Sequence, residues 1–203
     1  MSNINPLWDF PIWQYKTDFD DEFNQALQDE IYSIAQEMTH EQKPKDSLWD
    51  YNRPNLAILK STITDITNKL ISQDIPEVWE LNVKFKCDMG WPNVRHPGLG
   101  IELHAHPDAS FATTYYVRAP ENCGDFVAIL DNGRTKRFKP VAGTGVIIPA
   151  YILHEVEINK SNDLRISIST DFTTVVDKEA KNALVLRSWC ADMLQVREWT
   201  STN

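Results

Sequence analysis

The sequence predicts a mainly β protein, an antiparallel sandwich or jelly roll with flanking helices. Two observations carry this prediction. From Glu77 onward the spacing of apolar residues changes from helical to alternating, and the alternating segments are short and separated by glycine, proline, asparagine and aspartate. Seven such segments follow one another in roughly a hundred residues, a pattern typical of antiparallel β domains.

Two helices are predicted before the β core. Over residues 18–39 the apolar side chains recur every three or four positions, with acidic residues on the opposite side. Asp18 or Asp20 can cap this helix, and the acidic residues of its first turn suit the helix dipole. A second helix is predicted over roughly 56–73, after a polar connector.

The predicted strands are the segments ELNVKFKCDMGW, GIELHAH, ATTYYVRA, DFVAILD, GTGVIIPA, YILHEVEI and LRISISTDF. The tail, DKEAKNALVLRSWCADMLQV, predicts a final helix. We therefore expect residues 1–203 to form a single domain with an N-terminal helical region (1–76), a β core (77–173) and a C-terminal helix (174–203).

Composition excludes several classes of function. The net charge of −9 argues against a general nucleic-acid or anionic-membrane surface. No run of apolar residues approaches the length of a membrane span, and the N-terminus lacks the pattern of a signal peptide. The three cysteines are far apart and form no CxxC motif, which indicates reduced thiols. These features together predict a cytoplasmic protein.

Polar side chains gather on three of the predicted strands. Because side chains alternate across a strand, Glu102, His104 and His106 are expected to share one face of GIELHAH. His154 lies on YILHEVEI, and Arg165 lies on LRISISTDF opposite the apolar neighbours of that strand. A jelly roll could collect these groups in its interior, where polar groups need partners or a ligand.

The residue types suit a non-haem iron site. Imidazole is a good ligand for Fe(II), and a facial triad leaves positions open for a co-substrate and O2. The segment from His106 to Asp108 has the His-x-Asp form, and His154 is the distant histidine that would complete the triad. Arg165, on the next strand, could hold a carboxylate through two parallel hydrogen bonds. A lone His-x-Asp is common by chance, so the prediction depends on the whole set.

The β core resembles the 2-oxoglutarate/Fe(II)-dependent oxygenases. The similarity is to members with a W-x-N motif, an H-x-H-P-x-S/A motif, a Y-Y strand and a late H-x-V followed by R-I-S. The matching residues are Trp91, Asn93, His104, His106, Pro107, Ala109, Tyr115, Tyr116, Gly145, Pro149, His154, Val156, Arg165 and Ser167. The resemblance covers roughly 77–172 and implies a double-stranded β-helix, the cupin-like jelly roll.

The resemblance also implies a reaction and its cofactors. The enzyme would use Fe(II), 2-oxoglutarate and O2 to hydroxylate a small-molecule or peptidyl substrate, with release of succinate and CO2. Arg165 would pair with the distal carboxylate of 2-oxoglutarate. A hydroxyl of Ser167, Tyr115 or Tyr116 and the amide of Asn93 would add contacts.

The third metal ligand has two candidates. His106 and His154 belong to both versions of the site, and either His104 or Asp108 completes it. Strand geometry favours His104, which projects together with His106 before Pro107 interrupts the strand. Carboxylate chemistry favours Asp108, although aspartate is also common in turns.

Two other functions compete with this hypothesis. A three-histidine metal oxygenase would not use 2-oxoglutarate. A jelly-roll binding or structural module would hold no catalytic metal.

Overall fold

The computed structural model describes residues 11–40, 47–130 and 133–176. Most of the helix expected over 174–203 lies outside these residues. Thr174 and Val175, its first two positions, are the end of the last strand.

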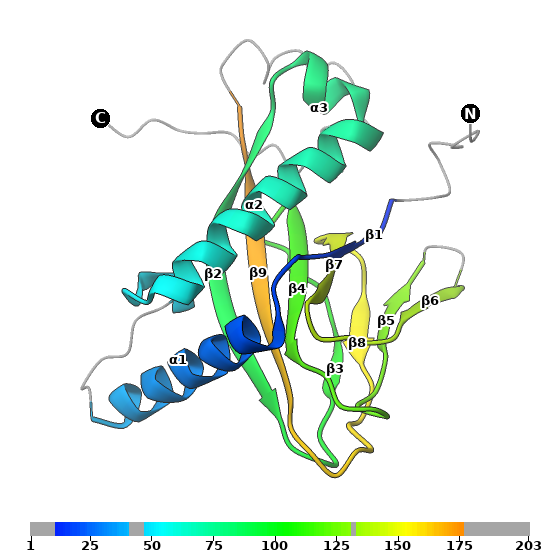
Figure 1. The fold of residues 1–203 in the computed structure, drawn as a ribbon. Helices are drawn as coiled ribbons and strands as arrows, with labels where there is room; N and C mark the ends of the chain where they lie inside the picture. Colours follow the sequence, from blue (N-terminus) through cyan, green and yellow to red (C-terminus); the bar gives the residue numbers. More distant parts are fainter. Residues whose placement is uncertain (1–10, 41–46, 131–132, 177–203) are drawn as a thin grey trace.

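Two antiparallel sheets form the β core (Figure 1). The five-stranded sheet has the order β1 (Trp13–Lys16), β7 (Thr144–Pro149), β4 (Phe111–Arg118), β9 (Arg165–Val175) and β2 (Lys84–Arg95). The four-stranded sheet has the order β3 (Ile101–His104), β8 (His154–Val156), β5 (Phe126–Ile129) and β6 (Thr135–Phe138). The predicted mainly β jelly roll is therefore confirmed.

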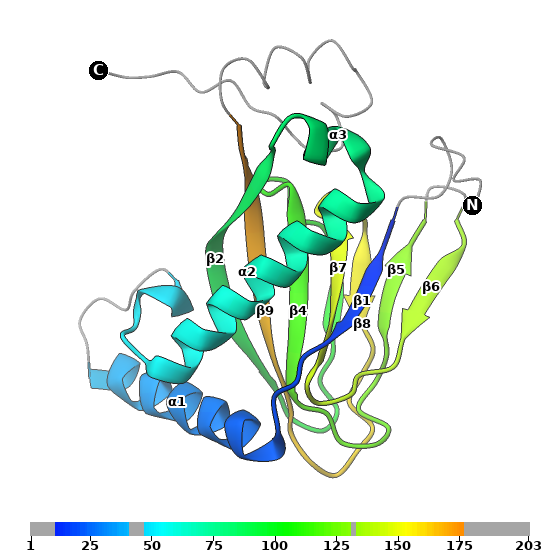
Figure 2. The ribbon, with the colours of Figure 1, turned by 45° about the horizontal axis from the view of Figure 1, so that its top comes forward.

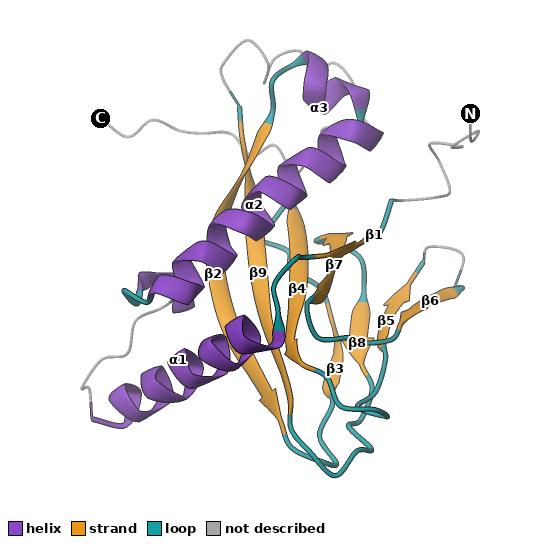
Figure 3. Cartoon of the chain, in the orientation of Figure 1, coloured by secondary structure: helices purple, strands orange, loops and turns teal. Residues whose placement is uncertain are grey.

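The helices cover the outer face of the five-stranded sheet. They are α1 (Asp21–His40), the short 3-10 helix η1 (Leu48–Asp50), α2 (Pro54–Asp74) and α3 (Pro76–Glu80). Figure 3 shows them gathered on one side of the strands, and Figure 2 shows α2 crossing β2, β9 and β4. Asp20 caps α1 as predicted, because its Oδ1 accepts a hydrogen bond of 2.8 Å from the backbone N–H of Phe23. Within the described residues, no helix is both long and apolar enough for a membrane span.

The five-stranded sheet separates two apolar cores. The larger core lies between this sheet and the helices, where Leu59 and Ile63 of α2 are buried together with Ile166 and Ile168 of β9. The smaller core lies between the two sheets and includes Phe126. Alternation along each strand assigns neighbouring residues to opposite cores.

Two strands were not predicted from the sequence. β1 lies in the region expected to be helical and pairs with β7, and the Nε1 of its Trp13 donates a hydrogen bond of 2.7 Å to Asp74 of α2. Its four residues are too few for alternation to be distinguished from chance. β6, with the sequence TKRF, is mostly exposed at the sheet edge and carries a single apolar residue. An exposed edge strand lacks the apolar signal that predicts buried strands.

Candidate metal centre

Three histidines converge between the two sheets. His104 ends β3, His154 begins β8, and the two residues are directly opposite each other in the antiparallel pair. His106 follows two positions after His104. One ring nitrogen of each histidine lies within 4.8 Å of a ring nitrogen of the other two. The Nε2 atoms of His106 and His154 are 3.3 Å apart.

An oxygen atom orients each of the three rings. The Nδ1 of His104 donates to the carbonyl of Glu102 at 2.7 Å, and the Nδ1 of His154 donates to the carbonyl of Ile152 at 2.9 Å. The Nδ1 of His106 lies 2.9 Å from the carboxylate Oδ1 of Asp171. A carbonyl oxygen can only accept, so the Nδ1 atoms of His104 and His154 carry the proton and their Nε2 atoms keep a lone pair for a metal. The nearby carboxylate of Asp171 favours the same tautomer for His106. Such outer contacts are typical of metal-binding histidines.

This donor set fits a divalent metal ion. Two Nε2 lone pairs that face each other at 3.3 Å repel unless a cation lies between them. Burial is the main cause that lowers the pKa of His154 to about 4; the neighbouring His104 and His106 act in the same direction and the hydrogen bond to Ile152 opposes them, so the ring is neutral at neutral pH. Neutral imidazoles of this kind suit Fe(II) as well as zinc and copper.

Asp108 does not join the histidines. It is exposed in the turn that follows β3, and the group that converges contains His104 in its place. The structure thus brings together His106 and His154, which belong to both predicted sites, and His104, one of the two candidates for the third ligand.

A register shift in β3 changes one sequence-based expectation. Simple alternation placed Glu102 on the same face as the histidines, but the pairing of β3 with β8 is irregular between Ile101 and His104. As a result Ile101 lines the interior together with His104, and Glu102 is exposed. Such irregularities redirect side chains at functional sites.

A cavity of about 250 Å³ extends from the three histidines into the sandwich. Aromatic rings flank the histidines: Trp91 stacks on His106 with 5.6 Å between ring centroids, and Phe126 stacks on His154 with 5.1 Å. Polar groups of β2, β4 and β9 line one wall; they are Asn93, Thr114, Tyr116, Ser167 and Ser169. The cavity is therefore apolar beside the histidines and polar along the five-stranded sheet.

Buried donors of β4 and β9 near this wall lack hydrogen-bond partners. Arg165 is 1% exposed, and its Nη1 donates to the carbonyls of Cys123 and Glu157, while its Nη2 is buried and unpartnered. The hydroxyl of Tyr116 is also buried and unpartnered. Burial raises the pKa of Tyr116, so the hydroxyl keeps its proton and can donate. Unpaired buried donors are unfavourable, and a ligand with acceptor oxygens would satisfy both.

The other predicted 2-oxoglutarate contacts divide between the two faces of the sheet. Ser167 and Asn93 line the cavity with Tyr116, as expected. Tyr115 does not, because adjacent residues of a strand point in opposite directions. Its hydroxyl donates to Oδ1 of Asn24 in α1 at 2.8 Å. Of the two tyrosine candidates, Tyr116 lines the cavity and Tyr115 does not.

Sequence reasoning missed two charged residues at this site. Asp171 follows the same alternation on β9 as Arg165 and Ser167, so extending that pattern would have found it. Arg95 lines the cavity from β2, two residues after Asn93. Alternation from Asn93 places Arg95 on the same face, but the predicted strand ended at Trp91 and so did not include Arg95.

Comparison with protein families finds a match over the β core. Residues 89–171, from β2 to β9, match the family described as "Putative 2OG-Fe(II) oxygenase". The β core of this chain is therefore similar to the 2OG-Fe(II) oxygenases, which are oxidoreductases. This confirms the resemblance found in the sequence and argues against a non-catalytic module.

Solved structures support the fold at low sequence identity. A prolyl-4-hydroxylase from Pseudomonas putida has a TM-score of 0.58 and 18% identity, with 80% of this chain and 88% of that chain covered. The alpha-ketoglutarate-dependent carbocyclase SnoK from nogalamycin biosynthesis has a TM-score of 0.62 and 10% identity, with 92% and 90% covered. The viral collagen prolyl hydroxylase vCPH from Paramecium Bursaria Chlorella virus-1 has a TM-score of 0.56 and 14% identity, with 81% and 96% covered. These likenesses show the shared jelly-roll fold alone. The search of curated proteins finds no match.

Proposed function

We propose that this chain is a dioxygenase that uses Fe(II), 2-oxoglutarate and O2 to hydroxylate a substrate and releases succinate and CO2. One observation carries the proposal: a single cavity joins three converging imidazole nitrogens to a wall where buried donors lack partners. A metal needs the first group, and a dicarboxylic co-substrate needs the second.

In this proposal His104, His106 and His154 hold the metal through Nε2. Bound Fe(II) supplies the activation of O2 that oxidises both the 2-oxo acid and the substrate. The rings reach the metal already oriented, because each Nδ1 is fixed by an oxygen acceptor or by Asp171. Three protein ligands leave positions for the co-substrate and O2.

Arg165, Tyr116 and Ser167 hold the distal carboxylate of 2-oxoglutarate. The unpartnered Nη2 of Arg165 and the hydroxyl of Tyr116 donate to its oxygens. The Nη1 contacts with two backbone carbonyls keep the guanidinium in place before the ligand arrives. Asn93 supports this wall, since its Nδ2 donates to Oγ of Ser169 at 2.9 Å. Trp91 and Phe126 exclude water around the histidines.

The substrate is proposed to be a small molecule or the side chain of a peptide. A cavity of about 250 Å³ must also hold the co-substrate, so the group that is oxidised has to be small or has to enter from outside as part of a larger molecule.

A second candidate function is oxygenation without 2-oxoglutarate. The observation that favours it is the absence of a carboxylate from the converging ligand group found among the described residues. The buried, unpartnered donors of the polar wall favour the first function, because an oxygenase without a 2-oxo acid has no use for them.

Anaerobic titration separates the two functions. Addition of Fe(II) and then 2-oxoglutarate should produce the weak visible charge-transfer band of the metal–2-oxo acid chelate, and admission of O2 should then yield succinate. Stoichiometric Fe(II) binding with neither the band nor succinate would favour the second function.

A further inference from the structure

Two arginines face each other at the polar wall of the cavity. Arg95 of β2 and Arg165 of β9 are direct partners in the antiparallel register. The side chains of directly opposed residues project from the same face of a sheet and lie close together. Arg95 lines the cavity, so both side chains project toward the cavity side.

This juxtaposition is unfavourable in the absence of an anion. Like charges that are directly opposite on paired strands destabilise a sheet. The pKa of Arg165 is lowered, first by burial and also by the charge of Arg95. Cys123 and Tyr116 would raise the pKa of Arg165 only if they were ionised, and both are neutral at neutral pH.

Neither charge is neutralised by an acidic side chain of the described residues. Arg53, Arg118 and Arg137 each form an ion pair with aspartate or glutamate. Arg165 instead donates to two backbone carbonyls, and its Nη2 has no partner. The Nε of Arg95 is likewise buried without a partner. Arg95, which lines the cavity, and Arg165, its partner on β9, therefore have donors available for an external anion.

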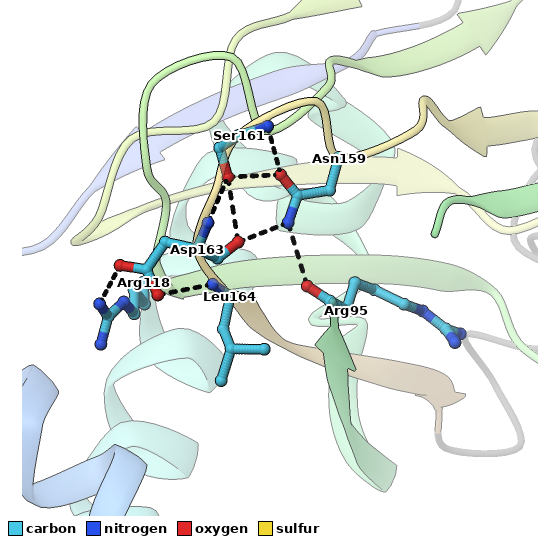
Figure 4. Close-up of polar contacts among 6 residues, drawn as sticks. All are labelled: Arg95, Arg118, Asn159, Ser161, Asp163 and Leu164. Atoms are coloured by element: carbon cyan, nitrogen blue, oxygen red, sulfur yellow. Dashed lines mark hydrogen bonds and ion pairs between the residues drawn. The ribbon is translucent and has the colours of Figure 1, made fainter. Parts of the chain in front are cut away.

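The backbone around the two arginines is fixed. Asn159, in the turn between β8 and β9, is 1% exposed, and its Nδ2 donates to the carbonyls of Arg95 at 3.1 Å and Asp163 at 2.7 Å. Its Oδ1 accepts a hydrogen bond of 3.0 Å from the backbone N–H of Ser161. Figure 4 shows this network and the side chain of Arg95 extending away from it. The network ties the end of β2 to the turn before β9, which holds the two arginines opposite each other.

We propose that Arg95 and Arg165 form a two-arginine carboxylate site, in which Arg95 is a specificity-determining second arm for the distal carboxylate of the 2-oxo acid. This inference rests on the proposed function. A carboxylate offers about four lone-pair positions, and it can accept charge-assisted hydrogen bonds from two guanidinium groups at once. Arg95 supplies further donors and relieves its own repulsion with Arg165 once the anion is bound. The site therefore selects dicarboxylic over monocarboxylic 2-oxo acids.

A pair of ligands tests this directly. The Mn(II)-loaded protein is titrated by calorimetry with 2-oxoglutarate and with 2-oxopentanoate, which has the same carbon chain without the distal carboxylate. We expect Arg95→Gln to weaken 2-oxoglutarate binding about ten- to a hundredfold, the usual effect of losing a charge-assisted contact, and to leave 2-oxopentanoate binding unchanged. Arg95→Lys, which keeps the charge but loses the planar fork, should give an intermediate loss.

Arg118→Gln is the matched control. Arg118 pairs with Asp163 beside the same turn and does not line this cavity, so its loss should affect neither ligand. Unchanged Mn(II) affinity shows that Arg95→Gln is folded at the metal site. Equal weakening of both ligands would assign Arg95 a structural role and overturn the inference. Unchanged binding of both ligands would overturn it as well, and would mean that Arg95 does not contact the co-substrate.

Binding by the parent protein distinguishes a failure of the proposed function from a failure of this inference. If the parent protein binds neither 2-oxo acid, the use of a 2-oxo acid is wrong and the two-arginine site falls with it. If the parent binds 2-oxoglutarate and only the effect of Arg95 is missing, the proposed function stands and this inference alone is overturned.

Discussion

The two faces of the five-stranded sheet have opposite chemistry although the same strands build both. Toward the helices, the strands present large apolar residues that are almost completely buried: Phe85, Phe111, Ile166, Ile168 and Phe172. Toward the four-stranded sheet, they present the polar residues that line the cavity: Asn93, Thr114, Tyr116, Ser167 and Ser169. Stability is thus concentrated on one face and ligand binding on the other. Substitutions of neighbouring residues should separate the two properties.

The largest effect is expected at the metal centre. His154→Ala should abolish stoichiometric Fe(II) binding, because one of three converging nitrogens is lost. The apolar contacts of Ile152 and Val156 remain, so the protein should stay folded. Metal analysis after purification without chelator, together with circular dichroism, checks this. Normal iron content in a folded variant would show that the three histidines do not form the metal site.

The next effect tests the apolar face. Ile168→Ala should lower the free energy of unfolding by about 2–5 kcal/mol, the usual loss for truncating a fully buried isoleucine. Ser167→Ala is the matched control on the opposite face and should cost about 1 kcal/mol or less in stability. Urea denaturation measures both. The comparison of the two faces fails if Ile168→Ala weakens binding of 2-oxoglutarate to the folded protein while Ser167→Ala does not.

Arg165→Lys should act on the co-substrate rather than on the metal. Lysine lacks the planar fork of arginine, and the loss of a charge-assisted hydrogen bond costs about 1.5–3 kcal/mol, or roughly a ten- to hundredfold loss of 2-oxoglutarate affinity. Fe(II) affinity should be unchanged. Titration of the chelate band measures the affinity for 2-oxoglutarate. Wild-type affinity in this variant would show that a residue other than Arg165 binds the distal carboxylate.

The smallest of these effects is expected at Asp171, which contacts His106 on the side away from the metal-binding Nε2. Asp171→Asn keeps the size of the side chain that faces Nδ1 of His106 but removes its charge. Loss of such an outer contact reduces metal affinity by about ten- to a hundredfold, and we expect the lower end because asparagine can still accept a hydrogen bond. Competition with a chelator measures the change, and an unaltered affinity would show that Asp171 does not support the site.

Much of the site could be predicted because alternation holds on β9. Arg165, Ser167 and Asp171 all follow from the single rule that side chains alternate along a strand. The same rule, applied to β4, separates Tyr116 from Tyr115 once one knows which face is polar. Only the structure shows which face of β4 is polar, because Tyr115 and Tyr116 are both buried and both have the same side chain.

Alternation fails on β2, and for a physical reason. The pairing of β2 with β9 shifts between Cys87 and Met89, where an extra residue is inserted. Phe85 and Cys87 therefore face the helices, whereas Trp91 and Arg95 face the cavity. A bulge changes which residues of a strand point inward, and no local pattern in the sequence reveals where it lies. The same limit applies to Glu102 on β3.

The three-histidine metal centre is tested most directly by comparing His104→Ala with Asp108→Ala. Iron content and the anaerobic chelate band with 2-oxoglutarate are measured in both variants. We expect His104→Ala to lose iron and the band, because its ring is one of the three that converge. Asp108→Ala should keep both, because its side chain lies in an exposed turn. Loss of iron in Asp108→Ala with retention in His104→Ala would contradict the three-histidine centre.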